Sequence, residues 1–165
     1  PATQAAVSKS PVSPPTANTL TTALVENDKK SFELTTRADL PPITETVARA
    51  LITEWERAQD TQNFASYRAC YSSNFLGIKR TTDSKTQMKY AAWMMDRRKM
   101  MPNVVEVQVD SPLYTLDGDT MVVKFIQKWR SVRVCDIGPK TMRIKMTENG
   151  PRIVYEELEY SNPCS

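Results

Sequence analysis

The sequence predicts an α+β fold, in which three N-terminal helices pack on one face of about four long antiparallel strands. Two observations predict it. Apolar residues recur at helical spacing between residues 43 and 102, and the period then changes to two up to residue 160. Runs of helices followed by runs of strands are typical of folds whose helices cover one face of a sheet. The 165 residues are enough for one such domain.

Three helices are expected in order. The first covers residues 43–60 and carries Trp55 on its apolar face, and the second covers residues 63–75. Residues 75–80 are expected to form a short strand or a loop. The Ser84 and Gln87 pair has the spacing of a capping box, which predicts a third helix that begins there and ends before Pro102.

The strands are expected to alternate with tight turns. Alternating segments at 104–110, 119–134, 141–147 and 152–160 predict the strands, and Asp117-Gly118 and Asn149-Gly150 are typical hairpin turns. A further turn is expected at Ile137-Gly138. These turn positions predict a register in which Trp129 pairs with Met146, Arg133 with Met142, Ile144 with Tyr155, and Met142 with Glu157.

The first 42 residues differ from the rest in composition. They contain six of the eleven prolines, and their charges cancel, which predicts an extended linker or docking arm over 1–42 before a folded domain over 43–165. Within the arm we expect a short helix or strand that docks through Phe32 and Leu34. Because the chain begins with Pro1, we expect it to be a processed or truncated product.

The composition excludes several kinds of site. The chain has no histidine, which excludes Ser-His-Asp and Cys-His sites and histidine-ligated metals. It contains neither a CxxC pair nor a phosphate-binding glycine loop, so neither a metal nor a cofactor is predicted. The net charge of +3 does not call for nucleic acid, and no apolar run is long enough for a transmembrane segment. What remains is a binding or assembly domain, or an enzyme that uses other side chains.

Several spaced motifs support a resemblance to a known superfamily. They are W-x-x-A-x-D from Trp55, Y-x-x-x-Y-x-x-x-F from Tyr67, W-x-x-x-R from Trp93, F-x-Q-x-W-x-S from Phe125 and D-x-G-x-K from Asp136. With the predicted element order, the chain resembles the nuclear transport factor 2-like (NTF2-like) superfamily, which includes SnoaL-like proteins. The resemblance implies a cone in which a strongly curved, cystatin-like sheet encloses a pocket.

Within the superfamily, the chain is similar to the accessory domain C-terminal to bacterial L,D-transpeptidase or L,D-carboxypeptidase domains in cell-wall enzymes. That similarity implies a periplasmic or secreted envelope protein and a peptidoglycan-related ligand, although the catalytic domain of those enzymes is absent from this chain. The superfamily also implies a homodimer formed through the outer sheet face. That face carries a stripe of cations, which alternatively predicts a surface for an anionic polymer: Lys124, Lys128, Arg130, Arg143 and Lys145.

Strand parity and helical spacing together predict the residues that face the pocket. The candidate ligand-binding residues are Tyr67, Tyr71, Trp93, Arg97, Gln127, Trp129, Ser131, Arg133, Tyr155 and Glu157. The alternative is that the aromatic residues are plain core and that Arg133 and Glu157 form a rim salt bridge without function. Cys135 and Cys164 should lie at the same end of the sheet, so we also hypothesise a disulfide between them, which requires an oxidising compartment.

The function predicted from these observations is a non-catalytic module that binds a small polar ligand, a cell-wall fragment or a partner protein in an aromatic-lined cone. No catalytic residue is assigned. The alternative is a small SnoaL-type isomerase, dehydratase or hydrolase that uses a buried carboxylate and a tyrosine. An enzyme requires a carboxylate deep in the cone and isolated from any cation, whereas a binding module would have that carboxylate paired or absent.

Overall fold

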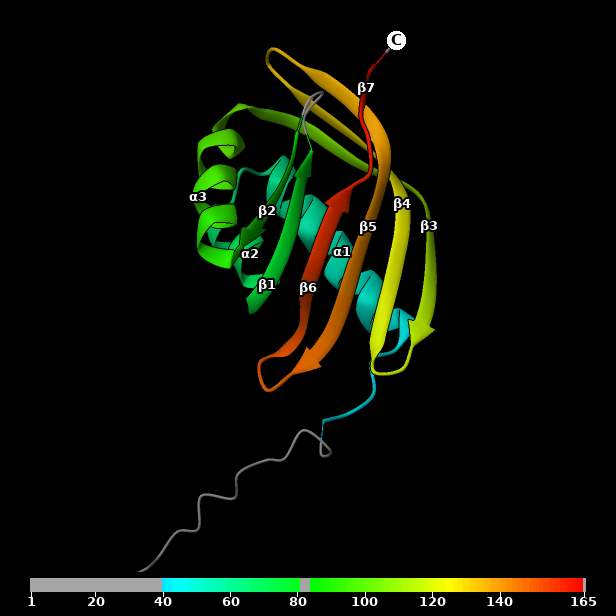
Figure 1. Cartoon of the computed structure of the whole chain (residues 1–165). Helices are drawn as coiled ribbons and strands as arrows, with labels where there is room; N and C mark the ends of the chain where they lie inside the picture. The colour runs from blue at the N-terminus through cyan, green and yellow to red at the C-terminus, as the bar shows by residue number, and fades with distance from the viewer. Residues whose placement is uncertain (1–39, 81–83, 165) are drawn as a thin grey trace, which may run out of the picture. The chain divides into compact units, whose positions relative to one another are not determined.

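The computed structural model describes residues 40–80 and 84–164. Most of the arm expected over 1–42, including the contacts expected from Phe32 and Leu34, lies outside the described residues. The described residues form helices packed on a curved sheet, which is the expected α+β architecture (Figure 1). None of the described helices is long and apolar enough to cross a membrane.

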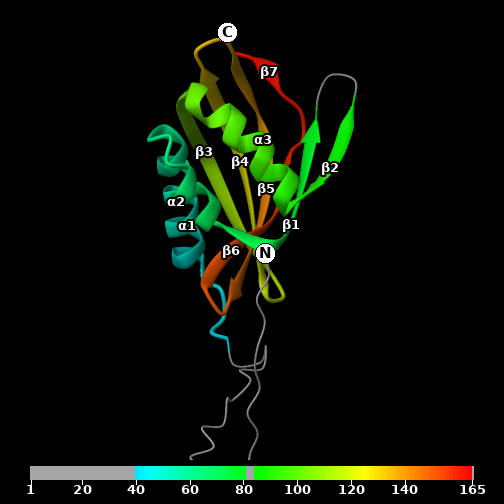
Figure 2. The same cartoon turned by 90° about the vertical axis from the view of Figure 1, so that its left-hand side faces the viewer.

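Three α-helices cover the sheet. Helix α1 (Glu45–Asp60) begins at Thr44, whose hydroxyl accepts a hydrogen bond from the Val47 amide at 3.3 Å, and it buries Trp55. Helix α2 (Phe64–Ala69) is short, and helix α3 (Tyr90–Met100) continues into the 3-10 turn η2 (Met101–Asn103). Helix α1 lies behind the strands in Figure 1, where it contacts β3 and β6, and α3 lies against β1 and β2 (Figure 2).

The sheet has seven strands and is mixed. They are β1 (Tyr71–Arg80), β2 (Lys85–Lys89), β3 (Val104–Asp117), β4 (Thr120–Ser131), β5 (Cys135–Thr147), β6 (Gly150–Leu158) and β7 (Asn162–Pro163). Their order is β2-β1-β6-β5-β4-β3, and β7 pairs with the free end of β5. All pairs are antiparallel except β1 with β6, which is parallel. The long helix and the inner sheet face bury Phe125, Met142, Ile144 and Ile153 between them.

The helix expected over 63–75 is wrong in its second half. It ends at Ala69, and the chain continues as β1. Tyr71 and Phe75 are four residues apart, a spacing that places two side chains on one face of either a helix or a strand, so periodicity does not separate the two cases. The expected capping box is also wrong, because Gln87 lies in β2 and pairs with Ile78 of β1. Residues 85–89 pair with β1 as an edge strand, so helix α3 begins only at Tyr90.

The turn expected at Ile137-Gly138 is wrong as well. The chain turns at 132–134, where the Ser131 hydroxyl accepts hydrogen bonds from the Arg133 and Val134 amides at 3.3 and 3.0 Å. Strand β5 therefore begins at Cys135, and Trp129 pairs with Asp136 instead of Met146. Glycine is required at 138 for another reason. A Cβ there would lie 2.0 Å from the backbone oxygen of Tyr160, which crosses close to it.

The expected hairpin is present with its turn at Glu148-Asn149, and Gly150, with a φ of +86°, is the first residue of β6. The register beyond it differs from the expected one in two steps: Ile144 pairs with Ile153 instead of Tyr155, and a β-bulge then follows Ile153. Met142 therefore pairs with Glu156 instead of Glu157, and Arg143 with Tyr155. The bulge reverses the parity of the end of β6, so Glu156 lies on the inner face with Met142, and Tyr155 and Glu157 lie on the outer face.

Candidate functional site

A cavity of about 200 Å³ lies between α3 and one end of the sheet, which is formed by the C-terminal parts of β1, β4 and β6 and the N-terminal part of β5. At about 30 Å³ per molecule this is the volume of roughly six or seven waters, so it suits one end of a small ligand. It is lined by Gln59, Tyr67, Ile78, Lys79, Arg80, Trp93, Arg97, Met100, Gln127, Trp129, Asp136, Lys140, Glu156, Leu158 and Ser161.

A buried ion pair forms the floor of the cavity. Lys140 of β5 donates to Oε1 of Glu156 of β6, and the two side chains are 5% and 1% exposed. The Lys140 ammonium also lies 5.0 Å from the centre of the Trp55 ring. Burial, opposed by the Glu156 carboxylate, lowers the pKa of Lys140. A buried charge is costly without a partner, and here each charge has the other.

The second carboxylate oxygen of Glu156 belongs to a network of aromatic side chains. The Tyr71 hydroxyl donates to Oε2 at 2.5 Å and accepts from the Trp55 indole N–H at 2.7 Å. The hydroxyls of Tyr67 and Tyr71 are 2.6 Å apart. Because a phenol has one hydrogen, Tyr67 donates in this pair. The Trp93 indole donates to Tyr67 at 3.3 Å.

This network keeps its phenols protonated. Burial, followed by the nearby Glu156 carboxylate, raises the pKa of both Tyr67 and Tyr71. Both carboxylate oxygens of Glu156 accept hydrogen bonds, one from Lys140 and one from Tyr71. The arrangement therefore positions a carboxylate deep in the cone but leaves it engaged by a cation and a phenol.

The wall of the cavity, in contrast, contains polar atoms without partners. The Arg97 guanidinium stacks over the Trp93 ring, 4.1 Å from its centre, as their helical spacing of four allows. Among the described residues, the Arg97 Nε is buried and donates no hydrogen bond, and the Gln127 Oε1 is buried and accepts none. Gln127 is 6% exposed and shares the inner face of β4 with Trp129. Both residues line the cavity, so its wall contains a donor and an acceptor that lack partners within the protein.

The structure brings together five of the ten residues predicted from the sequence. Tyr67, Trp93, Arg97, Gln127 and Trp129 line the cavity. Tyr71 lies beneath it and connects Tyr67 to Glu156.

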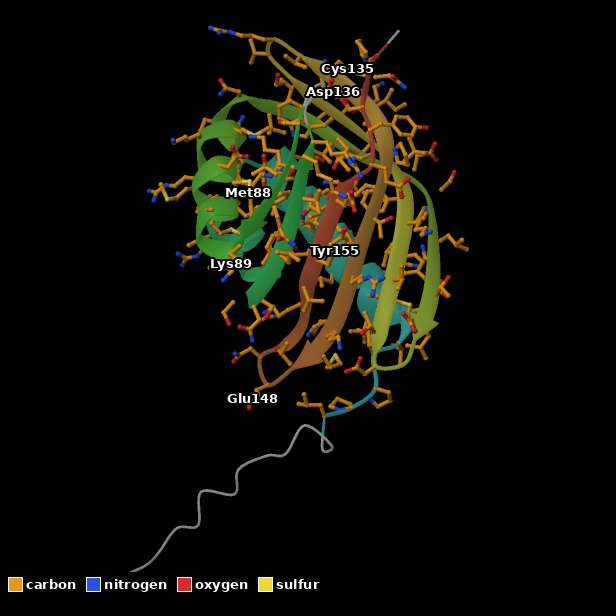
Figure 3. All side chains as sticks on the ribbon, viewed as in Figure 1. Met88, Lys89, Cys135, Asp136, Glu148 and Tyr155 are labelled. Carbon is orange, nitrogen blue, oxygen red and sulfur yellow. A yellow bond between two sulfur atoms is a disulfide. The ribbon has the colours of Figure 1, made fainter. Side chains whose placement is uncertain are left out.

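The other four predicted residues lie elsewhere. Ser131 ends β4, Arg133 lies in the turn after it, and both line a depression beside α3 that shares Lys79, Met100 and Trp129 with the cavity. Tyr155 lies on β6 in the middle of the sheet (Figure 3) and, with Glu157, lines a depression on the outer face. The expected pairing of Arg133 with Glu157 is wrong, because Glu157 pairs with Arg80 at 2.6 Å and with Lys85 at 3.3 Å.

Lys140 and Glu156 are the residues that sequence reasoning missed. The turn predicted at Ile137-Gly138 places Lys140 just after it, and the predicted pairing of Met142 with Glu157 places Glu156 on the outer face. Apolar periodicity does not identify buried charged residues. The one available indication was that Lys140 follows Asp136 and Gly138 with a period of two, which is the pattern of a strand that continues through them.

Three further features bear on the expected ligands and partners. The structure joins Cys135 and Cys164 by a disulfide, with Cys135 at the end of β5 near the C-terminus (Figure 3). Within the described ranges, no group of three or more histidine, cysteine or acidic residues is arranged to hold a metal. On the sheet, Arg130 pairs with Glu106 at 3.0 Å and Lys145 with Asp119 at 2.7 Å, which reduces the cationic character of that stripe.

No protein-family model and no curated protein matches the sequence. Solved structures do resemble the fold. Bd1075 of Bdellovibrio bacteriovorus aligns with a TM-score of 0.56 and 20% identity over 72% of this chain, which spans 40% of the length of Bd1075. An NTF2-like protein of unknown function from Pseudomonas putida gives a TM-score of 0.57 at 12% identity, covering 68% of this chain and 83% of that one.

A putative dehydratase of the NTF2-like family from Streptomyces avermitilis aligns with a TM-score of 0.56 at 10% identity, covering 73% of this chain and 95% of that one. The fold of this chain is therefore NTF2-like. At these identities the likeness concerns the fold alone, since one fold carries many functions.

Proposed function

We propose that this NTF2-like domain is a non-catalytic binding module whose cavity takes a small polar ligand. The observation that carries the proposal is the pairing of Glu156 with Lys140. A general base must be free to accept a proton from the substrate. Both oxygens of Glu156 already accept hydrogen bonds inside the protein, whereas the free donor and acceptor lie in the wall of the cavity.

We further propose a place in the bacterial envelope, periplasmic or secreted, and a peptidoglycan-related ligand. The disulfide between Cys135 and Cys164 supports this, because disulfides persist in oxidising compartments. The motif resemblance to accessory domains of L,D-transpeptidases and L,D-carboxypeptidases supports it as well. This chain spans only 40% of Bd1075, so the fold also occurs as one part of a longer protein.

The outer sheet face is proposed as a homodimer interface. Leu113 of β3, Ile126 of β4 and Ile137 of β5 are exposed large apolar residues on the strands that form it. Exposed apolar residues that gather on one face are typical of a surface that a partner covers. Sedimentation equilibrium should show a dimer that Ile126→Glu dissociates, and a wild-type monomer at the highest concentration used would contradict this.

The binding proposal is tested with muropeptides, released from peptidoglycan by a muramidase, added to the full 165-residue chain. Isothermal titration calorimetry should detect binding that Trp129→Ala in the cavity weakens and that Tyr155→Phe, on the outer face, leaves unchanged. Mass spectrometry should recover the fragments unaltered. Absence of binding at millimolar fragment would overturn the proposal, and fragments consumed by the protein would favour the SnoaL-type enzyme.

The enzyme alternative rests on one specific observation, the Tyr71 phenol 2.5 Å from Glu156 inside the cone. A tyrosine hydroxyl can donate to a developing oxyanion while a neighbouring carboxylate accepts a proton. Here, however, the Tyr71 hydrogen is already given to Glu156, so a substrate would have to break this bond before the pair acts on it.

A further inference from the structure

We infer that the ligand of the cavity carries a carboxylate with an N–H donor next to it, as in an N-acylated amino acid or the C-terminal end of a peptide. This rests on the proposed binding function and names the chemical class of its ligand. Four kinds of observation carry it: the charges that line the cavity, their ion pairs, the partnerless polar atoms of Arg97 and Gln127, and the size of the cavity.

The charges around the cavity favour an anion at one particular place. Two carboxylates, Asp136 and Glu156, and four cations line it: Lys79, Arg80, Arg97 and Lys140. Three of them are paired with carboxylates of the protein: Lys79 with Asp96 at 2.5 Å, Arg80 with Glu157, and Lys140 with Glu156. Within residues 40–80 and 84–164, Arg97 forms no ion pair.

The Arg97 side chain is held in a fixed place. Its guanidinium stacks over Trp93, and its Nη1 is 3.5 Å from the sulfur of Met100, which is a weak acceptor. The buried Nε has no partner at all. A guanidinium whose plane is fixed by an aromatic ring and whose Nε is without a partner matches the oxygens of a carboxylate. Arg97 is therefore the anion-binding group.

The acceptor for the adjacent N–H is Gln127. Its Oε1 is buried without a hydrogen bond, and a buried acceptor without a donor is unfavourable unless a water or a ligand supplies one. Gln127 lines the same cavity as Arg97. Asp136 lies two residues before Gly138, the β5 partner of Gln127, and adds a second acceptor to the lining of the cavity. Amide and ammonium groups both donate N–H to such acceptors.

The size of the cavity limits the rest of the ligand. About 200 Å³ accommodates one amino-acid unit with its acyl group, and the Trp93 and Trp129 rings supply an apolar surface for a small side chain. A longer peptide or a sugar would have to extend from the opening. The recognised part is thus a terminal one, with the carboxylate at Arg97.

Three matched probes separate the two recognised groups on the unchanged protein. N-acetylalanine has both groups, N-acetylalaninamide lacks the charge, and O-acetyllactate lacks the N–H. We expect N-acetylalanine to bind at least about tenfold more tightly than either analogue, since a charge-assisted or a buried hydrogen bond is lost in each. The measurement is the displacement of ¹⁵N amide resonances during titration.

Variants then assign each group to its residue. Arg97→Gln should weaken N-acetylalanine about tenfold and abolish its advantage over N-acetylalaninamide, and Gln127→Leu should abolish its advantage over O-acetyllactate. Arg130→Gln, on a cation already paired outside the cavity, is the matched control and should change neither. If Arg97→Gln does not fold, the three probes on the wild-type protein still decide the matter.

The outcomes distinguish this inference from the proposed function. If muropeptides bind in the cavity while the three probes bind equally or none of them binds, the ligand class is wrong and the binding module stands. If neither muropeptides nor probes bind, both are wrong. Preference for N-acetylalanine that depends on Arg97 and Gln127 supports both.

Discussion

Replacement of Lys140 by methionine removes the cation that faces Glu156 while keeping a side chain of similar length. The Glu156 carboxylate is 1% exposed and would be left with Tyr71 as its donor. Removal of one partner from a buried ion pair costs about 3–5 kcal/mol, because the other charge stays buried without compensation. We therefore expect Lys140→Met to lower the free energy of unfolding by about 3–5 kcal/mol at neutral pH.

The double variant Lys140→Met with Glu156→Gln separates charge from packing. Glutamine removes the charge and still offers an oxygen to the Tyr71 hydroxyl, so the unpaired charge disappears while the hydrogen bond remains. We expect the double variant to be more stable than Lys140→Met by about 2 kcal/mol, although it contains one more substitution.

Urea unfolding followed by tryptophan fluorescence measures both differences, since Trp55 and Trp93 belong to the affected network. With an m-value of about 1–3 kcal/mol per molar urea, the single variant should lower the midpoint by about 1 M or more. A single variant as stable as the wild type would show that Glu156 needs no cation, which would refute the paired-carboxylate argument and favour the enzyme. Equal losses in single and double variants would assign the effect of Lys140 to its packing on Trp55.

The remaining predictions concern stability and thiol chemistry. Tyr71→Phe removes a hydroxyl with three partners and should cost on the order of 3 kcal/mol in the same urea assay, more than Tyr67→Phe, and the reverse order would contradict the network. The Tyr155 hydroxyl, followed by a neighbouring arginine and lysine, holds the pKa of Glu157 below its ordinary 4.5. The stability that the ionised Glu157 contributes is present above pH 4.5 and is lost as the pH falls below it. Glu157→Gln should therefore flatten the decline of the melting temperature between pH 5 and 3. An unchanged decline would contradict this prediction. Burial raises the pKa of the Cys70 thiol to about 12, so the native oxidised protein should expose no thiol to Ellman's reagent at pH 8 and one after unfolding. Three thiols in the unfolded, unreduced chain would exclude the disulfide.

Local chemistry made part of the fold predictable. The Thr44 cap and the apolar face with Trp55 define α1 within a few residues of the sequence, so the helix is found where its pattern predicts it. The Asp117-Gly118 and Asn149-Gly150 turns contain glycines with φ of +60° and +86°, a backbone conformation that favours glycine. Strand periodicity then correctly placed Gln127 and Trp129 on the same face of β4.

Other parts depend on contacts between residues distant in the sequence. The sequence predicts Gly138 as a turn residue, but what excludes a side chain there is the backbone of Tyr160, which reaches it only when the C-terminal segment crosses β5. Tyr71 and Phe75 fit a helix and a strand equally well until β1 has β6 beside it. A spacing of four residues contains no information about which neighbour will be present.

Lys140 and Glu156 were missed together because their burial is a joint property. Each charge alone is unfavourable on the inner face, and the predicted register places Lys140 beside a turn and Glu156 on the outer face. The turn at 132–134 carries Lys140 into β5, and the bulge after Ile153 directs Glu156 inward. Either change alone would bury one unpaired charge. The sheet register and the ion pair therefore stabilise each other, and a one-residue slip in β6 would expose Glu156 and bury Tyr155 in its place. The bulge, which shows no local sequence pattern, thus decides which carboxylate lies in the cone.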